Sequence, residues 1–338
     1  MDAPVRRRLL LLVATSLLAA CGAPLVSDLP IDGATPTPRQ SATPTSTPAG
    51  SPTPQGLTIV VMDVGQGDST LIIGPQKTML VDGGDEGAPT AVIAKLHARN
   101  IGKLDWVVAT HPHADHIGGL DEVLHTFDAL DGVYDNGEPL STQAYTNYKA
   151  AAQATTGGER LIALGDTFDL GAGVLVTCVA VNGHLADGTS VTVSDPNDYS
   201  VGLVVEWGNF RFFVGGDLGG GGPGAADLET PLGAYIGAVD AIKINHHGSD
   251  TSTNSAWVNS LSPKVAIISD GDGNSYGHPD AAVLARLTGT DSTVHVPAPD
   301  LFLTERGAAP TTYAGAGDVE IDAQQTSFVV AGKHYSAN

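Results

Sequence analysis

The sequence predicts an α/β (α+β) fold in which two β-sheets pack face to face and helices cover their outer faces. Strand-like runs come early and in succession, and helical patterns are interspersed after them. This order suits two packed sheets better than one doubly wound parallel sheet, although hydrophobic periodicity alone does not separate the two. About 280 residues follow Gly56 without a second Pro/Ser-rich break or an internal repeat. One large domain over residues 56–338 is therefore expected.

The first part of this domain begins with strands and continues with alternating helices and strands. Short β-branched or apolar runs separated by Gly and Pro predict the strands, and apolar residues at helical spacing predict the helices. The expected elements are strands at residues 57–62, 70–73 and 78–81, a helix at 88–99, a strand at 106–109 and a helix at 118–127.

The same patterns predict the elements of the second part of the domain, and its strands are expected to be buried. Cys178 lies within one of these apolar runs, so it is expected to be a buried strand residue and not a reactive thiol. The expected strands are residues 174–181, 200–206, 210–214, 239–244 and 264–269, with helices at 255–261 and 281–287 and short tail strands at 293–296, 319–321 and 327–330.

The N-terminal residues are typical of a targeting segment and not of a folded domain. Three arginines, Arg6 to Arg8, precede an apolar run from Leu9 to Ala20 that is short for a membrane span. The run ends in Leu18-Ala19-Ala20-Cys21, which resembles the lipobox of bacterial lipoproteins. Residues 1–21 are therefore expected to be a lipoprotein signal peptide, and the protein to be exported and lipid-anchored through Cys21 on the extracellular or periplasmic side. The alternative is an ordinary signal peptide with a chance cysteine.

Residues 22–55 are expected to be a disordered tether between the anchor and the domain. They are rich in Pro, Thr, Ser, Ala and Gly and carry few large apolar residues. Such a segment buries too little apolar surface to fold. The domain can then stand clear of the membrane, which it would contact only through the lipid.

The net charge of −21 restricts the partners of the chain. An acidic surface repels polyanions at long range, which counts against tight binding of duplex nucleic acid by a basic surface. Bound metal ions can still create a local cationic pocket.

A cluster of potential metal ligands follows the strand predicted at residues 106–109. His111, His113, Asp115 and His116 lie within six residues, and each would need a polar partner if buried. In an extended loop His111 and His113 point the same way and can hold one ion, while the turn onto the helix brings Asp115 and His116 to a second. Imidazole and carboxylate donors suit Zn²⁺, with Mn²⁺ or Fe as alternatives. Two divalent ions are therefore the expected cofactors.

At this point the chain resembles the metallo-β-lactamase superfamily, whose His-x-His-x-Asp-His motif matches residues 110–116. Further matches follow in the family's order at residues 80–84, 213–217 and 244–249. The resemblance implies an αββα sandwich with two mixed sheets. It also implies a metal-dependent hydrolase.

A narrower resemblance concerns the substrate. Residues 62–69, 197–206, 246–249 and 269–279 together look like the hydrolase domain of ComEC-type DNA-uptake proteins, and the subgroup is also similar to secreted phosphorylcholine esterases. In ComEC-type proteins this domain is attached to a membrane channel. No channel segment is seen in this sequence, so a transport role is not carried over.

The resemblance implies a role for each matching residue. His246 would face the substrate, because two adjacent histidines cannot both bind one ion easily, and it could hydrogen-bond a phosphate oxygen or protonate a leaving alkoxide. Asp115 would also orient the nucleophile. The implied ligands are His111, His113 and Asp217 for the first metal, and Asp115, His116, Asp217 and His247 for the second.

Two further histidines are open candidates. Many superfamily members place another metal ligand between the positions of Asp115 and Asp217, and His184 could serve, or it could be an exposed loop histidine. His278 could line the catalytic pocket, or it could be a helix-start histidine packed on Tyr276.

The expected function is that of a phosphodiesterase or nuclease acting through a metal-bridged hydroxide on nucleic acid or a small phosphodiester. The alternatives are a carbonyl hydrolase, such as a lactonase, esterase or β-lactamase, that uses the same metals, and a non-catalytic surface-binding module. No obligate protein partner is evident.

Overall fold

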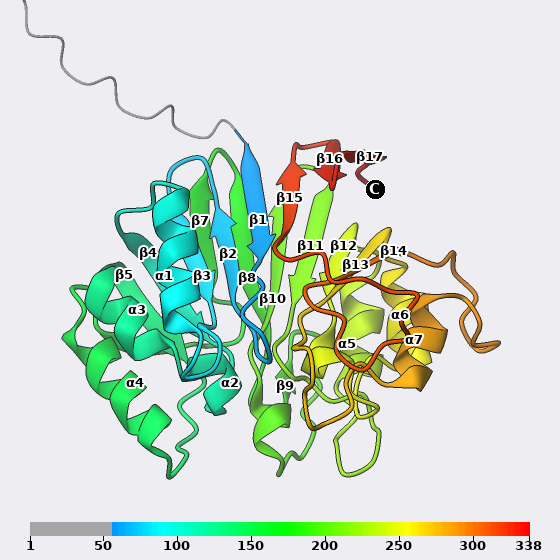
Figure 1. Ribbon diagram of the computed structural model, residues 1–338, viewed down its shortest axis with the longest axis horizontal. Coiled ribbons are helices and arrows are strands. Elements are labelled where there is room, and N and C mark those ends of the chain that lie inside the picture. The colour runs from blue at the N-terminus through cyan, green and yellow to red at the C-terminus, as the bar shows by residue number, and fades with distance from the viewer. Residues whose placement is uncertain (1–55) are drawn as a thin grey trace, which may run out of the picture. The chain divides into compact units, whose positions relative to one another are not determined.

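The computed structural model describes residues 56–338, and these residues form two β-sheets packed face to face between two layers of helices (Figure 1). The predicted αββα sandwich with mixed sheets is confirmed. The signal peptide predicted at residues 1–21, with Cys21, and the tether predicted at 22–55 lie outside the described residues.

The first sheet has nine strands in the order β17-β16-β15-β1-β2-β3-β4-β5-β6. Pairing is antiparallel from β17 to β3 and parallel from β3 to β6. Its strands are β1 (Leu57–Val61), β2 (Thr70–Ile73), β3 (Thr78–Val81), β4 (Leu104–Ala109), β5 (Ala129–Asp135), β6 (Glu159–Leu161), β15 (Val319–Ala323), β16 (Ser327–Val330) and β17 (Lys333–Ser336).

The second sheet has eight strands in the order β14-β13-β12-β11-β10-β8-β7, with β9 paired to β8. Pairing is parallel from β11 to β14 and antiparallel elsewhere. Its strands are β7 (Thr167–Gly171), β8 (Val174–Val181), β9 (His184–Leu185), β10 (Gly202–Trp207), β11 (Phe210–Val214), β12 (Ala241–Lys243), β13 (Val265–Ile268) and β14 (Asp300–Leu303).

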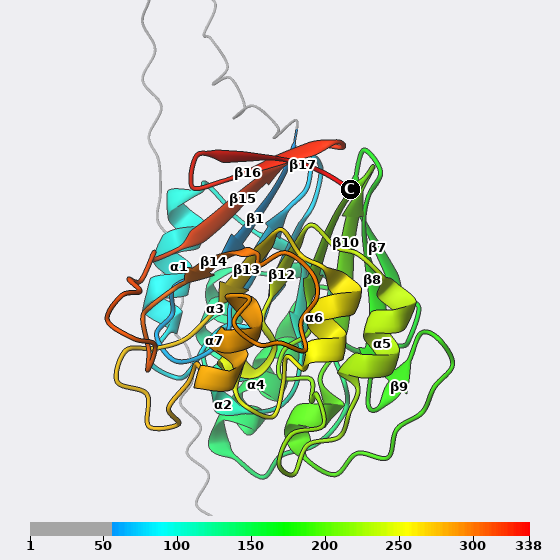
Figure 2. The same cartoon turned by 90° about the vertical axis from the view of Figure 1, so that its right-hand side faces the viewer.

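Helices cover the two outer faces, as the views in Figures 1 and 2 show. The first sheet is covered by helices from the first half of the domain and the second sheet by helices from the second half. These helices are α1 (Pro89–Ala98), α2 (Ala114–Ile117), α3 (Leu120–Thr126) and α4 (Gln143–Ala154), then α5 (Glu229–Ile236), α6 (Ser255–Leu261) and α7 (Ala281–Leu287), with two 3₁₀ turns, η1 (Pro196–Tyr199) and η2 (Asn245–Gly248).

The layers enclose three separate apolar cores. Val108 of β4 faces the core between the sheets, whereas its neighbour Val107 faces the core under the helices of the first sheet. This alternation follows the two-residue period of a strand. A third core packs Phe213 of β11 against Trp257 of α6, with ring centroids 4.9 Å apart. The central strands are thus apolar on both sides, which explains why their sequences read as continuous buried runs.

The tail departs from the prediction. The prediction of a strand at residues 293–296 is wrong, because this segment hydrogen-bonds to side chains of α6 and not to a neighbouring strand. Asn259 donates to the carbonyl of Thr293 (2.8 Å) and accepts from the backbone N–H of His295 (2.7 Å). The next strand is β14, which adds to the second sheet.

One predicted helix is shorter in the structure, and one cysteine is buried as predicted. The helix expected at residues 118–127 is α3, and a separate short helix, α2, precedes it, with Gly118 and Gly119 between the two. At Gly119 a Cβ atom would stand 2.4 Å from the carbonyl oxygen of Gly83, so the close approach of two loops requires glycine there. Cys178 is buried in β8 as predicted, and burial raises the pKa of its thiol to about 12.

No helix among residues 56–338 has both the length and the apolar character needed to cross a membrane.

Candidate metal centre

Four loops build a cluster of histidines and carboxylates, and each begins where a strand ends. Asp82 follows β3, the loop from His111 to α2 follows β4, Asp217 follows β11, and η2 follows β12. Strands β3 and β4 run parallel, as do β11 and β12. Each parallel pair therefore ends at one edge of its sheet, and the cluster joins the two sheets there.

Asp82 braces the loop that carries the histidines. Its Oδ1 accepts the backbone N–H of Thr110 (2.8 Å), and its Oδ2 accepts the Thr110 hydroxyl (2.7 Å). Oδ2 also lies 2.8 Å from Nδ1 of His116. A proton on Nδ1 leaves Nε2 of His116 facing the centre of the cluster, the arrangement that carboxylates give to metal-binding histidines.

One group of donors gathers on one oxygen of Asp217. Nε2 of His111 lies 3.8 Å from Asp217 Oδ2 and 3.1 Å from Nδ1 of His113. His111 is buried, while His113 is partly exposed. His111 thus faces Asp217 and has His113 beside it, whereas His113 belongs to none of the sets of ligand atoms that lie within 4.8 Å of one another among residues 56–338. These three residues are the ones that the resemblance assigned to a first metal.

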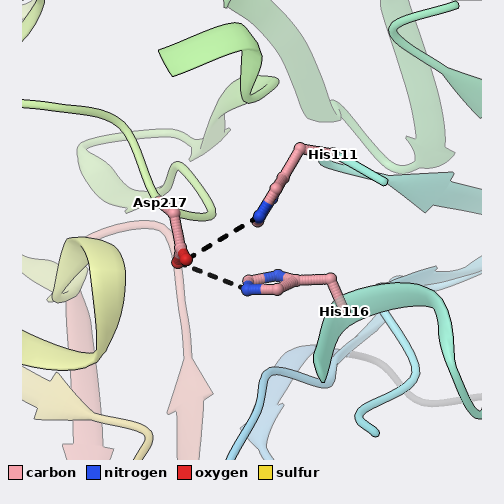
Figure 3. A group of neighbouring side chains, drawn as sticks. All are labelled: His111, His116 and Asp217. Carbon is pink, nitrogen blue, oxygen red and sulfur yellow. Dashed lines mark ion pairs between the residues drawn. The ribbon is translucent and has the colours of Figure 1, made fainter. Parts of the chain in front are cut away.

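A second group gathers on the other oxygen of Asp217. Oδ1 lies 3.3 Å from Nε2 of His116 and 3.6 Å from Nε2 of His247. The same nitrogen of His247 lies 3.3 Å from Oδ2 of Asp115. Figure 3 shows Asp217 opposite His111 and His116, with its carboxylate directed at both rings. Asp217 therefore joins the two groups, one through each oxygen.

The charges of the cluster favour a cation. Burial opposes a charge on His116, but Asp217, Asp82 and Asp115 outweigh it and raise the pKa of His116 well above its usual range. Burial likewise opposes a charge on His247, but mainly Asp217 and Asp68 raise its pKa to about 9. Protons on these imidazoles balance the carboxylates, and a divalent cation can take over that balance.

Two further donors, His111 and Asp115, are already in the protonation state that a metal requires. Burial, together with the neighbouring His116, lowers the pKa of His111 well below its usual range. Burial alone would raise the pKa of Asp115, but His116 and His247 hold it below the ordinary value. A neutral imidazole and an ionised carboxylate result, and both are metal ligands.

Buried atoms without partners supply the test of whether these residues fit a metal. Asp217 Oδ1, His116 Nε2 and His247 Nε2 are buried and make no hydrogen bond within residues 56–338. Leaving such atoms unpaired is costly, and here all three face one another. Sets of ligand atoms drawn from His111, His116 and Asp217, and from Asp115, His116 and His247, each lie within 4.8 Å of one another. The cluster fits divalent metal binding.

His246 stands beside the cluster on η2. Its Nε2 lies 3.7 Å from Asp217 Oδ2 and 3.4 Å from the amide nitrogen of Asn197, and its Nδ1 lies 2.8 Å from the Thr251 hydroxyl. Burial lowers the pKa of His246, the field of Asp217 being too weak to reverse it. A neutral imidazole thus faces the oxygen of Asp217 that His111 also faces.

The backbone of η2 is strained, and a buried glutamate holds it. His246 and His247 have φ angles of 49° and 51°, in the left-handed region that residues with a Cβ atom rarely occupy. Glu229, at the start of α5, is fully buried and accepts hydrogen bonds from the Asn245 amide (2.8 Å) and the Thr253 backbone (2.7 Å) on Oε1. Its Oε2 accepts the backbone N–H of Asn254 (2.8 Å). Glu229 therefore ties both ends of this loop to α5.

A buried ion pair behind the cluster was missed in the sequence. Lys243 ends β12 fully buried and pairs with Asp68, whose other oxygen lies 3.4 Å from Nδ1 of His247. A lysine inside an apolar strand was the available signal, because lysine is almost never fully buried unless paired. Nδ1 of His247 hydrogen-bonds the carbonyl oxygen of Ser269 (2.9 Å), and Asp68 adds its negative charge beside the same ring.

The structure distinguishes the two open candidates, His184 and His278. His184 is exposed on β9, where its Nδ1 lies 2.9 Å from the Ser190 hydroxyl, and it joins neither donor group. His278 lines the same pocket as His246 and His247, with its ring centroid 5.7 Å from that of His246, and it also stacks on Tyr276. Both expectations for His278 thus describe part of its surroundings.

One pocket of about 550 Å³ opens onto the cluster. Such a volume is in the range of small-molecule sites. Its lining combines the cluster with amide and aromatic side chains, among them Gln66, Asn197, Asn274 and Tyr276.

Sequence comparison connects this geometry to known proteins. A family model described as the metallo-beta-lactamase superfamily matches residues 62–269. The chain is 29% identical to the competence protein ComA of Neisseria gonorrhoeae over 68% of this chain and 29% of that protein. It is 27% identical to ComE operon protein 3 of Bacillus subtilis (67% and 30%) and to recombination protein 2 of Haemophilus influenzae (67% and 26%). The chain thus spans less than a third of each of these relatives.

Solved structures with similar chains include the metallo-beta-lactamase fold protein YhfI from Bacillus subtilis, at a TM-score of 0.46 and 13% identity over 74% of this chain and 98% of that one. Igni18, described as a metallo hydrolase from Ignicoccus hospitalis, gives a TM-score of 0.46 and 13% identity over 72% and 95%.

Proposed function

This chain belongs to the metallo-beta-lactamase superfamily, and from that premise we propose that it is a phosphodiesterase or nuclease with a dinuclear metal site. The observation that carries the proposal is Asp217, whose Oδ2 faces His111 and whose Oδ1 faces His116 and His247. A carboxylate placed in this way can bridge two ions, and paired ions can clamp both the attacking and the leaving oxygen of a phosphodiester. The metals are Zn²⁺ by preference, with Mn²⁺ or Fe as alternatives.

His111, His113 and Asp217 would hold the first ion, and Asp115, His116, Asp217 and His247 the second. When bound, the ions supply Lewis-acid charge that activates water and offsets the negative charge that develops on the phosphate. The remaining chemistry belongs to the side chains of the chain itself.

Asp115 and His246 act on the two sides of the reacting group. Asp115 stays ionised, so it accepts a hydrogen bond from the attacking water and fixes the direction of attack. His246 reaches into the pocket with Nε2, where a neutral imidazole with its proton on that nitrogen would donate a hydrogen bond to the leaving oxygen. The Thr251 hydroxyl beside Nδ1 fixes the orientation of the His246 ring.

The phosphodiester class is supported by the relatives and by the pocket. The relatives that align with the chain are named a competence protein, a ComE operon protein and a recombination protein, and the aligned part is less than a third of each. They agree with the resemblance of the sequence to DNA-uptake proteins. The pocket is lined by amides and imidazoles around the cluster, which are suitable hydrogen-bonding partners for phosphate oxygens.

We also propose that the enzyme is exported and lipid-anchored. The support is the sequence alone: the basic start, the apolar run and Leu18-Ala19-Ala20-Cys21, followed by the Pro/Thr-rich residues 22–55. The catalytic domain would then act outside the cell membrane and touch it only through its anchor.

A substrate screen with a His246→Ala variant tests the function. The protein loaded with Zn²⁺ or Mn²⁺ should hydrolyse bis-p-nitrophenyl phosphate, and His246→Ala should lower kcat by about 10² to 10⁴ while leaving the metal content intact, as expected for loss of a group that assists departure of the leaving oxygen. His97→Ala is the matched control, because His97 packs on Phe127 outside the cluster. Hydrolysis of lactones or β-lactams without diesterase activity would instead assign the chain to carbonyl substrates. Loss of metal in His246→Ala would make His246 a ligand.

A further inference from the structure

The wall of the pocket formed by residues 270–279 carries an unusual side chain. Tyr276 is 69% exposed, more than any other large hydrophobic residue among residues 56–338, and it lines the pocket. A single exposed aromatic residue needs no explanation by itself. The contacts around Tyr276 are what give its position a meaning.

The first contact is a stack that leads toward the cluster. The rings of Tyr276 and His278 are nearly parallel, with an interplanar angle of 14° and centroids 5.8 Å apart. His278 in turn lies edge to face with His246, at 5.7 Å between centroids. Tyr276 is therefore two rings away from the imidazole that faces Asp217. Because Tyr276 is so exposed, the ring face turned away from His278 is open.

The second feature is that the backbone beneath the stack is fixed. Asn274 Oδ1 accepts the backbone N–H groups of Tyr276 (3.2 Å), Gly277 (2.8 Å) and His278 (3.0 Å). Its Nδ2 donates to Asp270 Oδ1 (3.0 Å) and to the carbonyl of His278 (2.8 Å). One side chain thus satisfies the whole turn and holds the aromatic pair in place before any ligand arrives, which lowers the entropic cost of binding.

The third feature is an amide at the base of the same wall. Gln66 lines the pocket and contacts the wall through its Oε1, which lies 3.4 Å from the backbone nitrogen of Gly271. Its Nε2 is buried without a hydrogen-bond partner within residues 56–338. An unpaired buried donor is costly, so a ligand that accepts its hydrogen bond once the amide turns toward the pocket would be favoured.

We propose that Tyr276, stacked on His278, is the binding platform for a nucleobase adjacent to the scissile phosphate, with the Gln66 amide turning toward the edge of the base when the ligand binds. This inference rests on the proposed phosphodiesterase function and narrows its substrate to nucleotide diesters with an unpaired base. An open aromatic face binds a flat π-system, and such stacking is tolerant of base identity. The amide favours a group with hydrogen-bonding edges, which a nucleobase has and a quaternary ammonium lacks.

The platform also fits the charge of the chain. With a net charge of −21, the protein has little basic surface with which to capture a polyanion. Stacking supplies affinity that does not depend on such a surface. Bases inside a duplex are stacked on one another and cannot reach Tyr276 without being extruded, so single strands and frayed ends are the expected substrates.

The test compares two diesters with the same leaving group on the full-length, metal-loaded protein. Thymidine 5′-(p-nitrophenyl phosphate) carries a base, and methyl p-nitrophenyl phosphate carries none. The parent should prefer the thymidine ester in kcat/KM. Tyr276→Ala should reduce the ratio of the two kcat/KM values by about 5-fold to 150-fold, the equivalent of 1 to 3 kcal/mol of stacking, while Tyr276→Phe should retain it. Tyr235→Ala, which removes an exposed tyrosine of α5 outside the pocket, should leave the ratio as in the parent.

The outcomes separate the two proposals. A ratio that is equal in the parent, Tyr276→Ala and Tyr276→Phe overturns the platform and leaves the phosphodiesterase standing. A Tyr276-dependent preference for p-nitrophenyl phosphorylcholine over the thymidine ester also overturns it, in favour of a quaternary ammonium site. Failure of the parent to hydrolyse any of these diesters overturns the proposed function, and the platform with it.

Discussion

Asp217 is the residue on which the chemistry of this protein depends. It is buried, and its oxygens face imidazoles that come from both sheets, His111 and His116 from the first and His247 from the second. The sequence placed Asp217 in this role only through a resemblance, because nothing in its own neighbourhood shows that residues about 100 positions earlier lie against it. The spacing of His111 to His116, by contrast, was sufficient to predict a metal site directly.

Replacement of Asp217 by asparagine should empty the site. The amide keeps the shape of the side chain but is neutral, and its nitrogen must face one of the two groups of imidazoles. Bound metal, measured by mass spectrometry of the purified protein, should fall from about two equivalents to well under one. His184→Ala is the control and should keep the parental metal content, because His184 lies outside both donor groups. A variant Asp217→Asn that retains two equivalents would remove the proposed bridge.

At the scale of elements, the strands and helices with strong patterns were predictable. Helices α6 and α7 and strand β16 have the predicted bounds, because apolar spacing and turn residues agree there. Strand β6 was missed since it has only three residues at a sheet edge, and helix α4 since alanine and polar residues give it a weak apolar face. The strand predicted at residues 293–296 failed because its backbone is satisfied by Asn259, a contact that no local pattern reveals.

The strained turn η2 is likewise a product of tertiary structure. The sequence His-His-Gly-Ser does not predict that both histidines have positive φ angles. It also does not predict that a glutamate of α5 hydrogen-bonds to the two ends of this turn. Burial raises the pKa of Glu229 to about 7, although the hydrogen bonds from Asn254, Asn245 and Thr253 oppose the shift. The free-energy cost of burying Glu229 therefore increases as the pH rises and the group loses its proton.

The pH dependence has a definite sign. A carboxyl group whose pKa is raised on folding binds its proton more tightly in the folded state, so its effect on stability becomes less favourable as the pH rises from 4.5 to 7. Relative to Glu229→Gln, the free energy of unfolding of the parent should fall by about 2 to 3 kcal/mol between pH 5 and pH 8. Urea unfolding of both proteins in chelator measures the difference. A difference that is independent of pH, or that favours the parent at high pH, would contradict the assignment.

At the scale of the whole molecule, the chain is acidic, and its candidate site gains positive charge only from the protons or metal ions that it binds. The two sheets bring the ends of β3, β4, β11 and β12 to one place, and the carboxylates there require protons or cations for balance. Long-range attraction to a phosphodiester is weak for such a chain. Substrate binding and catalysis should therefore both depend on the metals.

The measurement that tests this claim most directly is diesterase turnover as metal is returned to the chelated protein. Hydrolysis of bis-p-nitrophenyl phosphate should be absent without metal and should reach its maximum near two equivalents of Zn²⁺ or Mn²⁺. Binding of a single-stranded oligonucleotide should appear over the same range. Turnover that persists at the parental rate after complete removal of metal would contradict the account.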